Sequence, residues 1–143
     1  MNSLFTLMLV LHVLIAVLGL GSMLSIAVVA LITRRAGRGP GEVLPWIASL
    51  LRLSAFSLAA MLATGIILDL AAKGAFRGSW WFRGSVLLLI AGGALNGAAR
   101  RTIRSGYVKQ ADHGFVLQRI ERIAYAMCAV VAGITVLMEV KPF

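Results

Sequence analysis

Four long apolar runs, separated by short connectors rich in basic residues, constrain the fold of this chain more than any other feature of its sequence. The first run carries no formally charged residue between Met1 and Thr33. The hydrocarbon core of a bilayer is about 30 Å thick, and roughly 20 residues of α-helix cross it. The runs are unbroken, whereas the strands of a membrane β-barrel alternate between apolar and polar residues. We therefore predict an all-α fold, an antiparallel four-helix transmembrane bundle.

The composition leaves no stretch for a second, water-soluble domain. Hydrophobic residues make up 60% of the 143 residues, charged residues make up only 13%, and the mean hydropathy is +0.94. These values are typical of an integral membrane protein. The N-terminal run lacks a basic n-region and is about twice as long as the apolar part of a cleavable signal peptide. The expectation is a single membrane domain over 1–143.

Helix-start and helix-stop signals indicate the ends of the predicted spans. The stretch TRRAGRGPGEVLP combines basic residues, glycine and proline, which end a helix and form a turn. Pro45 suits a first helical turn, the WWF segment at 80–82 suits a membrane interface, and Asp112 suits an N-cap. The predicted spans cover about 4–32, 45–72, 80–99 and 118–140.

The distribution of basic residues predicts the orientation. Nine lie in or beside the first and third connectors, namely Arg34, Arg35, Arg38, Arg100, Arg101, Arg104, Lys109, Arg119 and Arg122. Four lie at the other end, namely Lys73, Arg77, Arg83 and Lys141. Because basic residues concentrate on the cytoplasmic side, we expect both termini on the non-cytoplasmic side of a bacterial inner membrane. Their place at the ends of apolar runs accounts for the net charge of +9 without nucleic-acid binding.

Small residues within the runs indicate where helices approach one another, since leucine burial does not drive helix association in lipid. The predicted packing positions are Ala16 and Gly19 in the first run, Gly93 and Gly97 in the third, Ala129 and Gly133 in the fourth, and Ala55, Ala59 and Ala63 along one face of the second. We interpret these positions as internal packing surfaces. A homodimer seam or a larger membrane complex is the alternative.

Four polar side chains, one from each run, are predicted to lie toward the non-cytoplasmic leaflet: His12, Asp69, Arg83 and Glu139. Charges in lipid cost about 2.5 to 3.5 kcal/mol each on insertion scales, so they mark either a pair or a pathway. Such a cluster offers groups for binding a proton, a metal ion or a cofactor propionate. In the alternative, Asp69 pairs with Arg83, while Glu139 stays near Lys141 at the hydrated interface.

His12 is the only imidazole inside an apolar run. Its neighbours on the helix face, Ile15, Ala16 and Gly19, form a surface on which another helix can bury the ring. A buried neutral imidazole needs a hydrogen-bond partner. Three roles stay open: a hydrogen bond to Ser, Thr or a carbonyl of a neighbouring helix, a cofactor or metal ligand, and a proton-handling group.

A second intramembrane charge, Arg52, lies about two turns into the second run, and Glu121 lies at the same depth in the fourth. An unpaired guanidinium at that depth disfavours membrane insertion. We therefore predict a structural ion pair between Arg52 and Glu121.

The sequence contains no HExxH, CxxC or Walker-type motif. His113 belongs to the basic connector KQADHGFV, at the opposite end of the predicted bundle from His12. A haem held by two histidines is therefore disfavoured. A methionine such as Met61, Met127 or Met138, or no second protein ligand, would complete the axial positions. We assign no catalytic residue and no metal site.

Short motifs along the whole chain resemble those of a loose group of small bacterial membrane proteins. They are LHVLIAVLGLGSMLS, TGIIL, GSWWFRGS and LMEVKPF. The group includes the copper-resistance D-like proteins, the HemJ-type protoporphyrinogen oxidases and an uncharacterised four-helix family, and the chain looks most like the uncharacterised branch. The resemblance implies that His12 is the counterpart of the HemJ-type haem-ligand histidine, and that Arg83 stands roughly where that family has lysine. The chain departs from the HemJ pattern at Gly19, where tryptophan is common, and in the third run, where Asn96 is the nearest match to a further histidine.

These observations favour a non-enzymatic multi-pass membrane protein, either an accessory subunit or a small homo-oligomeric carrier. The alternative is a haem-binding or redox protein of HemJ type that uses His12. A proton-coupled exporter resembling the four-helix drug-resistance carriers ranks lower, because the first run has no carboxylate at its centre.

Overall fold

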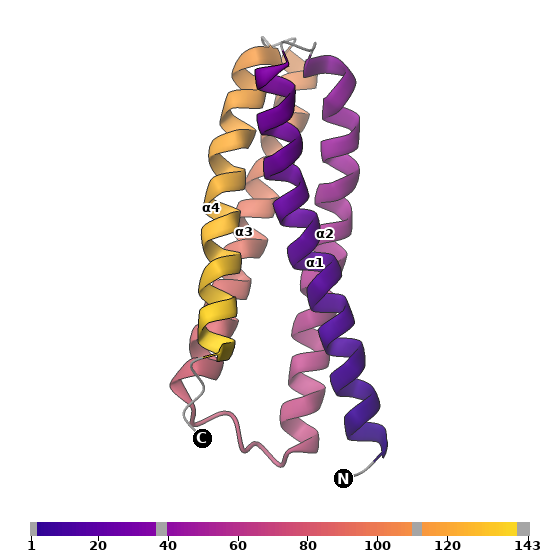
Figure 1. Cartoon of the computed structure of the whole chain (residues 1–143), viewed down its shortest axis with the longest axis vertical. Helices are drawn as coiled ribbons and strands as arrows, with labels where there is room; N and C mark the ends of the chain where they lie inside the picture. The colour runs from indigo at the N-terminus through magenta and orange to yellow at the C-terminus, as the bar shows by residue number, and fades with distance from the viewer. Residues whose placement is uncertain (1–2, 37–39, 110–112, 140–143) are drawn as a thin grey trace.

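The computed structural model describes residues 3–36, 40–109 and 113–139. These residues form four helices, α1 (Ser3–Arg35), α2 (Pro40–Ala71), α3 (Trp80–Lys109) and α4 (His113–Glu139), and they contain no strand. Successive helices run in opposite directions, so the start of α1 and the end of α4 lie at the same end of an elongated bundle (Figure 1). Each helix is long and apolar enough to cross a membrane. The predicted all-α, antiparallel four-helix bundle is confirmed.

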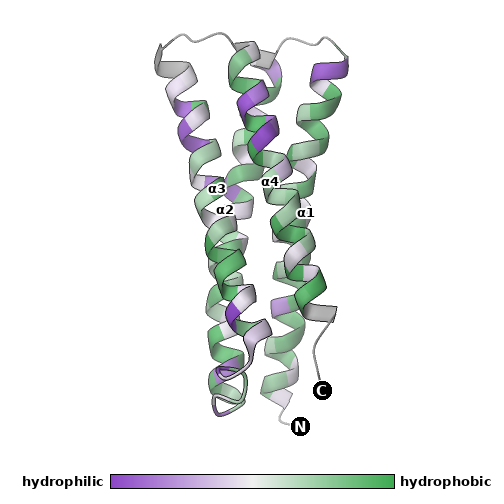
Figure 2. Cartoon of the chain, turned by 90° about the vertical axis from the view of Figure 1, so that its left-hand side faces the viewer, coloured by the Kyte–Doolittle hydropathy of each residue, from purple (hydrophilic) through white to green (hydrophobic). Residues whose placement is uncertain are grey.

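The helices are longer than the predicted spans at the end that carries the two basic connectors. α2 begins at Pro40, and α3 continues to Lys109 although its apolar run ends at Ala99. Arginine is a good helix former, so the helix persists after the apolar residues have ended. Figure 2 shows polar residues gathered at this end of the bundle and again in the turn between α2 and α3. The 33 residues of α1 extend over about 50 Å, more than the hydrocarbon core covers.

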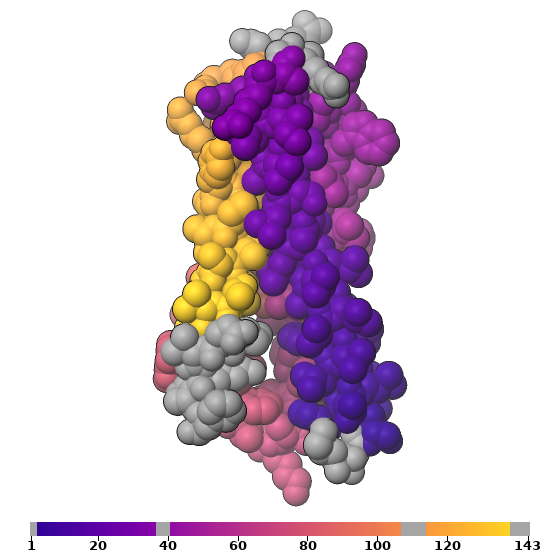
Figure 3. Space-filling model, in the orientation of Figure 1, coloured from indigo at the N-terminus to yellow at the C-terminus, as the bar shows by residue number. Residues whose placement is uncertain are grey.

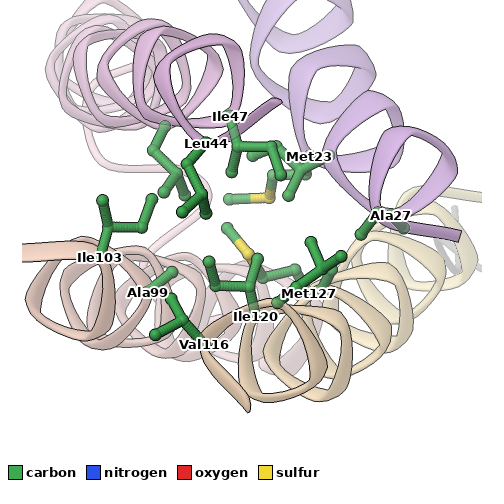
Figure 4. Close-up of a cluster of buried hydrophobic side chains, with 14 of the residues drawn as sticks. Met23, Ala27, Leu44, Ile47, Ala99, Ile103, Val116, Ile120 and Met127 are labelled. Carbon is green, nitrogen blue, oxygen red and sulfur yellow. The ribbon is translucent and has the colours of Figure 1, made fainter. Parts of the chain in front are cut away.

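We call the connector end of the bundle the closed half, defined as residues 19–36, 40–58, 92–109 and 113–131. Its interior is one cluster of buried apolar side chains to which all four helices contribute (Figure 4). The cluster includes Met23, Ile26, Ala30, Leu44, Ile47, Leu51, Ala99, Ile103, Val116, Leu117, Ile120 and Met127. Close packing of this kind holds the four helices together at this end.

Two glycines permit the closest helix approaches. A Cβ atom on Gly19 would lie 2.8 Å from the Cβ of Ser57, and one on Gly106 would lie 2.7 Å from Cγ2 of Val116. Carbon atoms pack best at about 3.5 to 4.0 Å, so only glycine fits at either place without a shift. The first contact brings α1 onto α2, and the second brings α3 onto α4.

We call the other end the open half, defined as residues 3–18, 59–71, 80–91 and 132–139. None of the residues 3–18 of α1 is buried. The pair formed by α1 and α2 diverges from the pair formed by α3 and α4 toward this end (Figure 1), and a small gap remains beside the first turns of α1 in the space-filling view (Figure 3). The two helix pairs are therefore joined mainly through the closed half.

A short turn connects α2 to α3 at the open end. The Gly74 N–H donates to the carbonyl of Asp69 (2.8 Å) and the Lys73 N–H to that of Leu70 (3.0 Å), the two bonds of a Schellman cap. Lys73 has a φ of 54° and Gly74 a φ of 76°. Lys73 thus occupies the left-handed C′ position that usually holds glycine. The turn folds the chain back, so that residues after α2 return to its last turn.

Candidate functional site

The imidazole of His12 lies against α2 in the open half. Its Nδ1 is 2.7 Å from Oγ1 of Thr64. The Thr64 hydroxyl donates its proton back to its own helix. It lies 2.8 Å from the carbonyl oxygen of Ala60 and 3.2 Å from that of Met61. Because a threonine has one hydroxyl proton, Oγ1 must accept from the histidine. This network assigns a proton to Nδ1, which donates to Thr64.

The next residue of α2 explains why the ring fits there. A Cβ atom on Gly65 would lie 3.5 Å from Cε1 of His12, so the ring packs directly on the surface of α2. The histidine of the LHVLIAVLGLGSMLS motif therefore touches the first two residues of the TGIIL motif. Of the three roles left open for His12, a hydrogen bond to a threonine of a neighbouring helix is present in the structure.

Asp69 pairs with an arginine that the sequence did not single out. Its Oδ2 accepts from Nε of Arg77 at 2.6 Å, and its Oδ1 accepts from the Phe76 N–H at 3.3 Å. The expected alternative partner, Arg83, donates from Nε to the carbonyl of Arg77 at 3.1 Å. The Asp69–Arg83 pair is therefore wrong. The Schellman turn places Arg77 over the end of α2, so a residue eight positions away along the chain reaches the carboxylate first.

The predicted cluster of His12, Asp69, Arg83 and Glu139 is thus divided among separate contacts. His12 bonds to Thr64, and Asp69 and Arg83 both contact Arg77. The side chains of His113, Met138 and Glu139, and all of Asp112 and Lys141, lie outside the described part of the structure.

Glu121 is buried in the closed half, with 4% of its surface exposed. Its two oxygens accept from Nη1 of Arg34 at 3.0 and 3.2 Å, and Oε1 lies 3.3 Å from the hydroxyl of Tyr125. Arg52, its predicted partner, is exposed and forms no ion pair within the described residues. The prediction of an Arg52–Glu121 pair is wrong, because α4 packs against α1 far more extensively than against α2.

The predicted packing positions fall into two groups. Gly19 contacts Ser57, and a Cβ atom on Gly133 would lie 3.0 Å from Cδ1 of Leu88, so both are internal contacts. Nothing lies within 4 Å of a Cβ atom placed on Gly93 or Gly97, and Ala129 is exposed. Ala16 is half-buried. The interpretation of Gly93 and Gly97 as an internal seam is therefore wrong, because α2 and α3 pack loosely at this height and leave a groove.

The methionines differ in their relation to His12. Met127 is fully buried in the core of the closed half. Met61 is buried on α2 and lies one helical turn before Thr64. Within the described ranges, no three His, Cys, Asp or Glu side chains are grouped closely enough to hold a metal ion.

Comparison with protein-family models, curated proteins and solved structures finds no match for this chain.

Proposed function

We propose that this chain is a non-enzymatic multi-pass protein of the bacterial inner membrane that acts as an accessory subunit or a small homo-oligomeric carrier. The observation that carries the proposal is the open half, where the pair of α1 and α2 separates from the pair of α3 and α4 (Figures 1 and 3). Where the two helix pairs separate, their facing sides are not covered by each other. A helix of a second chain or a transported molecule can pack against those sides.

The polar groups of the membrane region support the same proposal. His12 and Asp69 are each held by a neighbour on the α2 side of the bundle, and Glu121 links α4 to α1. Polar contacts of this kind join helices within the bilayer. They place the ionisable groups in structural contacts between elements instead of in one shared site.

A crosslinking experiment tests the proposal. A photoreactive amino acid replaces Leu11, 41% exposed in the open half, and, as the matched control on the same helix, Val28, 53% exposed in the closed half. We expect an adduct of one defined size from position 11 in native membranes and much less from position 28. Twice the monomer mass indicates a homo-oligomer, and another mass indicates an accessory subunit. Equal, diffuse labelling at both positions overturns the proposal.

The proposed orientation is tested with single cysteines in a Cys128→Ser background. An impermeant maleimide should label Gly78→Cys, in the turn between α2 and α3, in intact cells. It should label His113→Cys only after the membrane is permeabilised. Labelling of position 113 from the periplasm contradicts the orientation with both termini on the non-cytoplasmic side.

One observation favours the second candidate, a haem-binding or redox protein of HemJ type. Histidines that bind a metal through one ring nitrogen usually donate the other N–H to a fixed acceptor, and Thr64 supplies that acceptor for His12. His12 would thus serve as one axial ligand of a haem. Met61, on α2, is the candidate for the second axial position. Arg83 at the same end would hold a propionate. Haem would supply the redox chemistry.

Purification from haem-replete cells tests this candidate. A Soret band that is lost in His12→Ala, and shifted but retained in Thr64→Ser, supports it. Protein that is folded, colourless and fully lacking haem in the pyridine haemochrome assay contradicts it. The crosslinking result is independent of this outcome.

A further inference from the structure

Two grooves flank α3 where the closed half meets the apolar part of the bundle. The first, of about 340 Å³, lies between α2 and α3 and is lined by Ala55, Ala59, Gly93, Asn96, Gly97 and Arg100, among others. The second, of about 590 Å³, is formed by α3 and α4 and is lined by Gly97, Ala98, Arg101, Ser105, Arg119 and Ile123, among others. Gly97 lines both grooves, and nothing lies within 4 Å of a Cβ atom placed on it, so no side chain stands between them at this position of α3.

The height of these grooves follows from the helix register. The apolar run of α3 from Trp80 to Ala99 has the length of the hydrocarbon core, about 30 Å, so Arg100 and Arg101 lie at its edge. Asn96 donates from Nδ2 to the carbonyl of Leu51 at 3.1 Å, which places the antiparallel Trp46 near the same edge. Trp46 is 72% exposed, as expected of an interfacial aromatic residue.

Cationic groups gather at this edge. Arg100, Arg101 and Arg119 are exposed and form no ion pair within the described residues. Arg52 is also exposed. It lies one turn before Ala55, which lines the first groove, and next to Leu51, whose carbonyl is bonded to Asn96. A guanidinium next to hydrocarbon is stabilised by an anion, and its planar fork of donors matches a phosphate. Basic pockets between membrane helices are typical sites for acidic lipid headgroups.

Asn96 supplies a second, independent indication of a ligand. The side chain is 2% exposed and lines the first groove, yet its Oδ1 has no hydrogen-bond partner within the described part of the chain. Its Nδ2 uses one N–H on Leu51 and has a second to offer. Asn96 lies about one turn below Arg100, the depth at which the glycerol and ester groups of a lipid follow its phosphate.

We propose that α3 carries a binding site for an acidic glycerophospholipid. The phosphate binds Arg100 and Arg101, with Arg52 and Arg119 on either side. One acyl chain lies in the groove over Gly93, and the other lies along Ala98 and Ile123. Asn96 donates to an ester carbonyl, and its Oδ1 accepts from a water held by the headgroup. The open space at Gly97 lets the glycerol group pass across the helix.

Lipid binding to the full-length, delipidated protein in detergent tests the site. Native mass spectrometry and thermal unfolding are recorded with phosphatidylglycerol, with phosphatidylcholine of the same acyl chains, and with inorganic phosphate alone. We expect phosphatidylglycerol to bind and to raise the melting temperature, and the other two to have little effect. Equal binding of both lipids, or an equal effect of free phosphate, overturns the proposal.

Two variants locate the site. The double change R100Q/R101Q should weaken phosphatidylglycerol binding about fivefold for each arginine removed, whereas Arg35→Gln, an exposed change away from the grooves, should leave it unchanged. Gly97→Leu should place a side chain between the grooves, and because nothing lies within 4 Å of its Cβ it should fold normally. Gly21→Leu, which also has open space, is its control.

The result for Gly97→Leu also separates the lipid from a second copy of the chain. Loss of phosphatidylglycerol binding with an unchanged mass in detergent supports the lipid site. Loss of a dimer with lipid binding retained assigns the groove to helix packing between copies and overturns the proposal. If Gly97→Leu alters the melting temperature without lipid, R100Q/R101Q decides the outcome, since exposed arginines are dispensable for folding.

Discussion

The closed and open halves of this bundle are built from the same kinds of residues but are held together differently. In the closed half, large apolar side chains from all four helices are buried together. The part of this cluster around Ile103, Val116 and Ile120 lies past the apolar run of α3, where burial from water stabilises it as in a soluble protein. Close packing stabilises the rest of the cluster. The open half lies where lipid surrounds the helices, and leucine gains little by leaving lipid for protein. Its helices are joined by individual contacts such as His12 with Thr64.

The largest expected effect comes from overfilling the closed half. Gly106→Val places a Cβ atom 2.7 Å from Cγ2 of Val116, a side chain with little rotamer freedom, so α3 and α4 must separate. We expect the free energy of unfolding to fall by about 3 kcal/mol. Reversible unfolding in mixed detergent micelles measures the loss.

Two glycine controls turn this change into a comparison between the halves. Gly84→Val meets only the flexible end of Leu137, at 3.0 Å, in the open half, and Gly21→Val meets nothing within 4 Å. Both should cost about 1 kcal/mol or less. If Gly84→Val cost as much as Gly106→Val, the difference in packing between the halves would be refuted.

The second prediction concerns the ion pair of the closed half. Arg34→Met leaves the buried carboxylate of Glu121 with Tyr125 alone. Removing one partner of a fully buried pair costs about 3 to 5 kcal/mol. The side chain of Arg34 is 62% exposed, so water screens the pair and we expect about 1 to 2 kcal/mol. Arg52→Met, measured without acidic lipid, should stay within about 0.5 kcal/mol. A larger loss for Arg52→Met than for Arg34→Met would restore the pair predicted from depth alone.

The predictable part of the fold follows from composition along the chain. Membrane insertion depends on the length and hydropathy of a run, so four helices with alternating direction could be predicted without tertiary information. The extension of α3 from Ala99 to Lys109 could not, because arginine ends an apolar run without ending a helix. That extension builds part of the closed half.

The pairing of charges was predicted less well, since neither the register of the helices nor the neighbouring helix is readable from sequence. Arg52 lies next to Leu51, which is level with Asn96, whereas Glu121 lies nearer the closed end, where α1 covers the face of α4 that carries it. The partner of Asp69 had a local signal: Arg77 follows within a turn that contains Gly74, where the chain must reverse. The threonine beside His12 belonged to a motif already noted, but only the helix register brings the two together.

The third prediction measures the contact that joins α1 to α2 in the open half. Thr64→Val removes the acceptor of the His12 N–H while keeping the side-chain shape. In a double-mutant cycle with His12→Leu, we expect a coupling energy of about 1 kcal/mol, near the upper part of the range for polar contacts between membrane helices. The control is Thr33→Val. The Thr33 hydroxyl bonds to the carbonyl of Val29 in its own helix, so this change should show no coupling to His12. A coupling near zero for Thr64 would leave the open half without its polar contact.

The smallest expected effect, and the only stabilising one, lies in the turn at the open end. Lys73 adopts a φ of 54° at the C′ position of α2, a conformation in which a Cβ atom crowds the following carbonyl. Lys73→Gly relieves that crowding, although the unfolded chain gains freedom, and the net gain in unfolding free energy should be about 0.5 to 1 kcal/mol. Lys73→Ala, which removes the charge but keeps the Cβ atom, should give no gain. The turn lies at the far end of the bundle from Gly106. If Lys73→Gly raises the unfolding free energy by the same amount in the Gly106→Val background, the two halves contribute independently to stability.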